Sequence, residues 1–154
     1  MHPPLEITRR IAAEPGRVWE AFTRAEALRE WFHPPGVECA GAECEPYPGG
    51  IYRIRFRVPA ADQEFGLTGV FLAVNAPKSL CYSWRWEDRP GFEFVSKVEV
   101  SFEPDEGGVS VHVRHCGIPG ATEREDHERG WNAVLGSLET YLAAKTASPS
   151  TQTR

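Results

Sequence analysis

The side chains best suited to acid–base chemistry are two of the five histidines, His115 and His127. His115 ends the alternating segment 109–115 and shares the parity of its valines, so its imidazole should point to the apolar side of a strand. His127 precedes Trp131 by four residues, which places both on one face of a helix. Imidazoles at a pocket mouth could act as a general base or orient a polar ligand group. The simpler interpretation, which we favour, is two histidines hydrogen-bonded to backbone or water.

The four cysteines, Cys39, Cys44, Cys81 and Cys116, do not form a disulfide or metal-binding pattern. Cys39 and Cys44 are spaced as C-x4-C, no C-x2-C pair occurs, and Cys116 has the wrong strand parity to join His115 at a metal. Small buried thiols are the simpler explanation. The sequence also lacks G-x-S-x-G, H-E-x-x-H, P-loop and G-x-G-x-x-G motifs. We therefore predict no metal and no cofactor. His33 and the acids Glu123, Asp126 and Glu128 are also considered for catalysis, and the candidates retained are the two histidines.

Aromatic side chains make up 11% of the chain, and most of them are expected in its core. A core and a ligand cavity use the same apolar residue types, so the sequence does not separate the two. Ligand pockets are mostly apolar with a few placed polar groups. The hydroxyls of Tyr52 and Tyr82 and the indole N–H of Trp84 could supply such groups.

The elements that position these residues can be read from the hydrophobic pattern. Leu5–Ile11 is predicted to be a strand, and residues 12–32 form two short helices packed by their aromatics. From Val37 to Cys116 the pattern indicates strands separated by turns. Ile51–Val58 alternates cleanly, with arginines on one face and apolar side chains on the other. Residues 65–74 are apolar on both faces, so their orientation cannot be predicted.

After residue 120 the period becomes helical, with an apolar stripe formed by Trp131, Val134, Leu135, Leu138, Tyr141 and Leu142. Hairpin-connected strands are antiparallel, and a sheet with one apolar face needs a cover. The predicted fold is α+β: a curved antiparallel sheet of six or seven strands wrapped around a long C-terminal helix, with two short helices after the first strand. One helix does not fill a curved sheet along its full length, so a cavity between them is expected.

The charge balance excludes several partners. Seventeen basic and 22 acidic residues give a net charge of −5, which provides no positive field for nucleic acid or an anionic membrane. Arg53, Arg55 and Arg57 are expected to pair with acids on neighbouring strands. Without a membrane-length apolar stretch or a signal-peptide core, the chain is expected to be cytoplasmic, with no nucleic-acid or membrane partner. We predict one domain, residues 5–145, with flexible termini at 1–4 and 146–154.

Five sequence blocks, in order between Leu5 and Leu142, resemble a known family. They are ITRRIAAEPGRVWEAFTRAEALREWF, YPGGIYRIRFR, GVFLAVNAPKSLCYSW, VEVSFEPDEGGVSVHVRHCGIP and GWNAVLGSLETYL. Together they are similar to the START-like, Bet v 1-like superfamily (SRPBCC), in the branch of the C-terminal domain of the Hsp90 ATPase activator Aha1. One departure is Val109, where the family usually has Thr. The resemblance implies a helix-grip fold with a cavity between sheet and helix.

The predicted function is binding of a small hydrophobic or amphipathic molecule in that cavity, and we expect a binding protein more than an enzyme. The predicted ligand-binding residues are Trp31, Tyr52, Ile54, Phe56, Tyr82, Trp84, Phe94, Val98, Val111, His115, His127, Trp131 and Leu135. Two alternatives stay open: an enzyme of the polyketide cyclase type that uses a pocket histidine, and an Hsp90-activator-like interaction module. Nothing resembles the separate N-terminal Aha1 domain, so an Hsp90 interaction is not expected. Whether the chain forms a homodimer stays open.

Overall fold

The computed structural model describes the backbone of residues 3–152 and the side chains of residues 3–144. Its elements are β1 (Leu5–Ile11), α1 (Pro15–Thr23), α2 (Ala25–Trp31), β2 (Glu38–Cys44), β3 (Ile51–Val58), the 3-10 turn η1 (Pro59–Ala61), β4 (Gln63–Asn75), β5 (Ser79–Glu87), β6 (Val95–Asp105), β7 (Gly108–Cys116) and α3 (Ala121–Gln152). The backbone of α3 thus continues through most of the segment predicted as a flexible C-terminus. Residues 1–2 and 153–154 of the predicted flexible ends lie outside the described residues.

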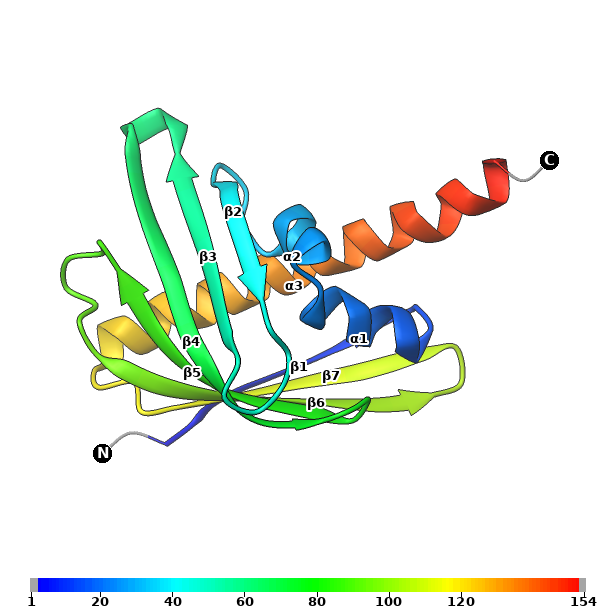
Figure 1. Cartoon of the computed structure of the whole chain (residues 1–154), viewed down its shortest axis with the longest axis horizontal. Helices are drawn as coiled ribbons and strands as arrows, with labels where there is room; N and C mark the ends of the chain where they lie inside the picture. Colours follow the sequence, from blue (N-terminus) through cyan, green and yellow to red (C-terminus); the bar gives the residue numbers. More distant parts are fainter. Residues whose placement is uncertain (1–2, 153–154) are drawn as a thin grey trace.

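The seven strands form one antiparallel sheet in the order β1-β7-β6-β5-β4-β3-β2. The strands before and after α1 and α2, namely β1 and β2, lie at opposite edges of this sheet. Figure 1 shows the sheet bending around α3, which crosses its concave side. Register shifts in β2 and β4 interrupt the ladder, and such bulges increase local twist. The predicted α+β helix-grip fold is confirmed.

The alternation predicted for β3 is present in the structure. Tyr52, Ile54 and Phe56 are buried toward α3, whereas the three arginines of this strand point outward. Outside, Arg53 Nε lies 3.0 Å from Glu87 Oε1, and Arg57 Nη2 lies 2.9 Å from Asp62 Oδ1. The arginine row is therefore a solvent face neutralised by nearby acids.

The sequence did not predict which side chains of β4 face the core. In the structure, a close contact between β4 and its two neighbouring strands at Gly69 fixes this choice. Leu67 and Phe71 are buried, and Val70 and Leu72 are exposed. Gly69 pairs with Tyr52 across the ladder, and a Cβ at Gly69 would overlap the Ser83 carbonyl oxygen and the Tyr52 ring. Only glycine fits at this crossing, so the even-numbered side chains up to Leu72 lie on the outer face. The bulge between Phe71 and Ala73 then reverses the alternation, and Val74 packs against the core.

The predicted apolar stripe of α3 is buried, including Trp131, Leu135 and Leu138. The short helices lie beside the C-terminal half of α3 (Figure 1). There Phe22 packs against Trp31 with ring centroids 4.9 Å apart, and the Trp31 indole N–H donates to the Ala21 carbonyl over 2.8 Å. The N-terminal half of α3 faces the bent sheet without a short helix packed beside it. No helix in the described part of the chain is long and apolar enough to cross a membrane.

Candidate functional site

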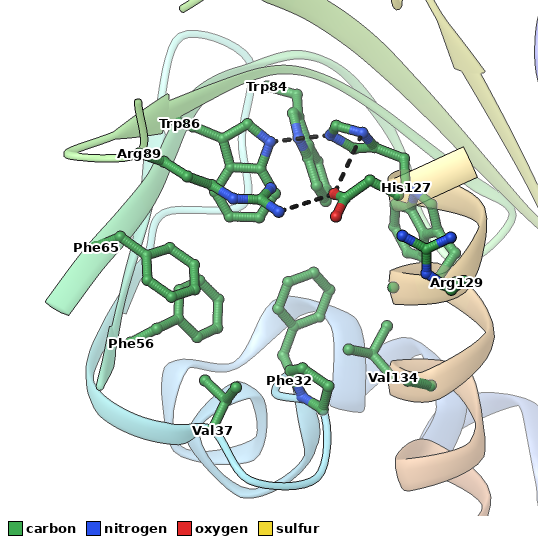
Figure 2. A pocket seen from close by; sticks show the side chains of 15 residues that line it. Phe32, Val37, Phe56, Phe65, Trp84, Trp86, Arg89, His127, Arg129 and Val134 are labelled. Atoms are coloured by element: carbon green, nitrogen blue, oxygen red, sulfur yellow. Dashed lines mark hydrogen bonds and ion pairs between the residues drawn. The ribbon is translucent and has the colours of Figure 1, made fainter. Parts of the chain in front are cut away.

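A cavity of about 370 Å³ lies between the N-terminal half of α3 and the sheet. Its lining comes from β3, β4, β5, the loops after α2 and β5, and α3: Phe32, Pro34, Val37, Phe56, Phe65, Trp84, Trp86, Arg89, Asp126, His127, Arg129, Gly130, Trp131, Ala133 and Val134. Figure 2 shows the labelled aromatic side chains arranged around the open space. The α3 side is lined partly by Gly130 and Ala133, and a Cβ at Gly130 would meet nothing within 4 Å. Small residues on the helix therefore keep this space open.

Packing among the aromatics holds the cavity wall in place. Phe56 and Phe65 stack with ring centroids 5.0 Å apart on one side. On the other side, Trp84 lies 5.3 Å from Trp131 and Phe32 lies 6.0 Å from Trp131, again between centroids. Because each ring is fixed by a neighbouring ring, the wall is largely preformed rather than assembled around a ligand.

His115, on β7, lies behind this wall with 1% of its surface exposed. The Trp131 indole Nε1–H donates to its Nδ1 over 3.0 Å, and its Nε2 lies 2.8 Å from Ser96 Oγ. Since Nδ1 accepts the indole proton, a neutral ring carries its own proton on Nε2 and donates it to the serine oxygen. Burial, followed by the nearby His127, lowers the pKa of His115 from 6.5 to about 3.

His127, on α3, lines the cavity and is 3% exposed. Its Nε2 accepts the Trp86 indole N–H over 2.9 Å, and its Nδ1 lies 2.7 Å from the Glu123 carbonyl oxygen. A carbonyl oxygen only accepts, so the Nδ1 proton is donated to it and the ring is neutral. Burial lowers the pKa of His127, against the opposing effect of its bond to Glu123.

The two imidazoles form a matched pair with opposite tautomers, their ring centroids 5.1 Å apart. Each uses its free lone pair to accept an indole N–H, from Trp131 in one case and Trp86 in the other. Protonating either imidazole would place a new N–H where the ring now accepts a hydrogen bond. That N–H would point at the N–H of the neighbouring indole. Neither lone pair is therefore available as a general base without first breaking an indole hydrogen bond.

The charged groups lie at the cavity mouth. Arg89, in the loop after β5, donates from Nη2 to Asp126 Oδ2 over 2.8 Å. Its guanidinium carbon lies 3.8 Å from the Phe92 ring centroid and 4.4 Å from the Trp86 centroid. The ion pair joins the loop to α3, and the cation–π contacts hold the guanidinium against the loop and β5. Figure 2 shows Arg89 lying beside the Trp86 ring. Arg129 lines the mouth from α3, and its guanidinium makes no ion pair or hydrogen bond with any residue that the structure describes.

The sequence matches the family model described as "Activator of Hsp90 ATPase homolog 1-like protein" over residues 12–143. The chain belongs to this family.

Solved structures agree with the family assignment. Protein CV1439 from Chromobacterium violaceum is 26% identical with a TM-score of 0.82, over 92% of this chain and 98% of that chain. The AHSA1 protein SPO3351 from Silicibacter pomeroyi is 21% identical with a TM-score of 0.81, over 92% and 99%. DynU16, from the dynemicin biosynthetic locus, shares the fold at 17% identity and a TM-score of 0.72, over 94% of this chain and 49% of that chain. No curated protein matches the chain.

In this AHSA1-family chain, the predicted site residues are distributed over three environments. Phe56, Trp84, His127 and Trp131 line the large cavity. Tyr52, Ile54 and Tyr82 line a separate, much smaller space of about 20 Å³, which has room for about one water molecule. Trp31, Phe94, Val98, Val111, His115 and Leu135 line neither space. Of these six, all but the half-buried Phe94 are packed into the core.

The polar groups predicted to orient a ligand do not reach the large cavity. The Tyr52 hydroxyl donates to the Ser83 carbonyl over 2.7 Å. Burial raises the pKa of Tyr52 and, likewise, that of Tyr82. The Trp84 indole nitrogen is covered by protein and has no hydrogen-bond partner among the described residues. These groups belong to the packed side of the wall.

Among the lining residues absent from the predicted ligand-binding set are Trp86, Phe65, Arg89, Asp126 and Arg129. The sequence could have identified Trp86 as a lining residue, because it lies on the same face of its strand as Trp84. Phe65 lies in the segment whose orientation the sequence left open. The three charged residues come from a turn and from the solvent side of the helical stripe, where no periodicity points to a cavity.

The cysteines and acids do not form a metal centre in the described part of the chain, where no group of three suitable ligands gathers. All four thiols are free and half-buried. Burial raises the pKa of Cys44 to about 12, so this thiol is protonated and unreactive at neutral pH.

Proposed function

We propose that this chain binds a small hydrophobic or amphipathic molecule in the cavity between the sheet and α3. The observation that supports this most directly is the lining: six side chains of phenylalanine or tryptophan and four aliphatic ones surround a preformed space, with charges only at its mouth. Ligand pockets in proteins have this composition, with volumes of roughly 300–1,000 Å³. At about 370 Å³ the cavity suits a compact ligand rather than an extended polycyclic one.

Burial of apolar ligand surface would drive this binding. An aromatic ligand that buries roughly 150–250 Å² gains about 4–6 kcal/mol at ~25 cal/mol per Å². The loss of translational and rotational freedom offsets part of this gain. A fixed aromatic wall keeps the remaining ordering cost low.

The acid–base alternative finds less support, because both imidazoles already accept an indole N–H. The question of a homodimer stays open and the Hsp90-type interaction stays the alternative that we do not expect, since neither depends on this cavity.

The test is a ligand screen paired with a cavity-filling variant. Three of the five tryptophans line the cavity, so binding should change intrinsic fluorescence as well as raise Tm. Gly130→Phe places a ring in the open space at Gly130, and Asn132→Phe places the same ring on the exposed side of α3. Small aromatic and aliphatic compounds that stabilise the wild type and Asn132→Phe should not stabilise Gly130→Phe. Equal stabilisation of all three proteins would contradict the proposal.

A further inference from the structure

The interior of the cavity has no polar side-chain group left to offer a ligand. The indole N–H groups of Trp86 and Trp131 are donated to the two histidines. Both ring nitrogens of His127 are engaged, and the Trp84 nitrogen is covered by protein. A ligand hydroxyl or amide placed deep in the cavity would lose its hydrogen bonds to water without replacement, at a cost of about 1–3 kcal/mol. The buried part of the ligand must therefore be apolar.

The mouth, in contrast, offers an excess of hydrogen-bond donors. Each guanidinium carries five N–H donors. Within the described part of the chain, the one hydrogen bond made by the guanidinium groups of Arg89 and Arg129 is that from Arg89 to Asp126. Asp126 is the only acid among the lining residues, and its charge is already matched by Arg89 at 2.8 Å.

The formal charge of the mouth is consequently positive. Two arginines and one aspartate give +1, because burial lowers the pKa of His127 and keeps it neutral. This local excess occurs in a chain whose net charge is −5. A guanidinium such as that of Arg129, with all five donors free, is suited to a carboxylate, which it can bind through two parallel hydrogen bonds.

We propose that the ligand is a small aromatic anion, with an unsubstituted ring system in the cavity and a carboxylate-like group at Arg129. This inference rests on the proposed function and specifies its ligand class. The aromatic wall receives the flat body, and the mouth receives the charge. A cationic ligand would meet Arg89 and Arg129, and a neutral amide would offer Arg129 one acceptor oxygen but no negative charge.

The probes that test this share one ring system and differ in charge: naphthalene-2-carboxylate, its neutral carboxamide, and the naphthalen-2-ylmethylammonium cation. Tryptophan fluorescence titration should give the carboxylate a Kd about five- to tenfold lower than the amide, and the cation the highest Kd. The preference for the carboxylate should shrink as salt is raised from 50 to 500 mM, because the mouth is partly exposed.

The variants assign the preference to one side chain. Arg129→Gln should reduce the carboxylate-to-amide ratio about fivefold while leaving the amide Kd unchanged. Arg85→Gln, an exposed arginine on β5 outside the cavity, should leave the ratio unchanged. Equal affinity for carboxylate and amide, tightest binding of the cation, or an unchanged ratio in Arg129→Gln would each overturn the inference.

Binding of the probes to Gly130→Phe tests the proposed function separately from the anion inference. If the naphthalene probes bind Gly130→Phe as tightly as the wild type, the cavity is not their site, and both statements are overturned. If Gly130→Phe abolishes binding but charge has no effect, only the anion inference is overturned.

Discussion

Replacing His115 by glutamine removes a buried titrating group while keeping an acceptor and a donor at that position. In the wild type, the neutral imidazole accepts the Trp131 indole N–H and lies 2.8 Å from Ser96 Oγ. The glutamine amide offers a carbonyl oxygen and an N–H for the same two partners. We expect His115→Gln to fold, and to lose a large part of the acid sensitivity of the protein.

The size of the expected change in folding free energy follows from the pKa of His115, which falls from 6.5 to about 3 on burial. Between these values the unfolded chain binds a proton that the folded chain does not, so stability rises with pH and is lost as pH falls below 6.5. From pH 8 to pH 5 this single group removes about 2 kcal/mol of folding free energy. The pKa of His127 is lowered too, so His127 contributes with the same sign and should leave a residual slope in His115→Gln.

The assay is urea unfolding at several pH values from 5 to 8, with Cm compared at constant m. His115→Gln should recover about 2 kcal/mol of the loss between pH 8 and pH 5. The matched control is His112→Gln, which removes a partly exposed imidazole from the outer face of the same strand. If His115→Gln changes the pH slope no more than His112→Gln does, the buried neutral imidazole is not the cause of acid sensitivity.

Two further predictions concern the same wall. Trp131→Phe leaves the His115 Nδ1 lone pair buried without its donor, so urea unfolding at pH 8 should show a loss of about 1–3 kcal/mol; unchanged stability would contradict this. Gly130→Ala should raise stability by about 0.5–1 kcal/mol in thermal unfolding, because its Cβ meets open space within a helix. Gly69→Ala should be destabilising, because its Cβ would overlap the Ser83 carbonyl; a stability ranking of Gly69→Ala above Gly130→Ala would refute the packing argument.

Much of the fold follows from local periodicity. The alternation in 51–58 predicted which β3 side chains face α3, and the helical stripe predicted the buried face of α3. The parity of His115 also predicted correctly that it faces the inside of the sheet. These predictions succeed because a strand or helix with one apolar face has only one way to bury it.

The segment 65–74 shows where that reasoning stops. Its apolar residues on both faces give no preferred orientation, and the choice depends on Tyr52 crossing over Gly69 from the neighbouring strand. The charged mouth was missed for a similar reason. Arg89 and Asp126 are 37 positions apart in the chain, and only the docking of the loop after β5 on α3 brings them together.

The sequence by itself determined the element order, the inward faces of β3, β7 and α3, and the family. Only the tertiary structure decided which aromatic rings border empty space, because buried and cavity-lining positions use the same side chains. It also decided the state of the two histidines. Their indole partners lie 16 and 41 positions away in sequence, and a hydrogen bond of about 3 Å exists only once strand and helix are packed together.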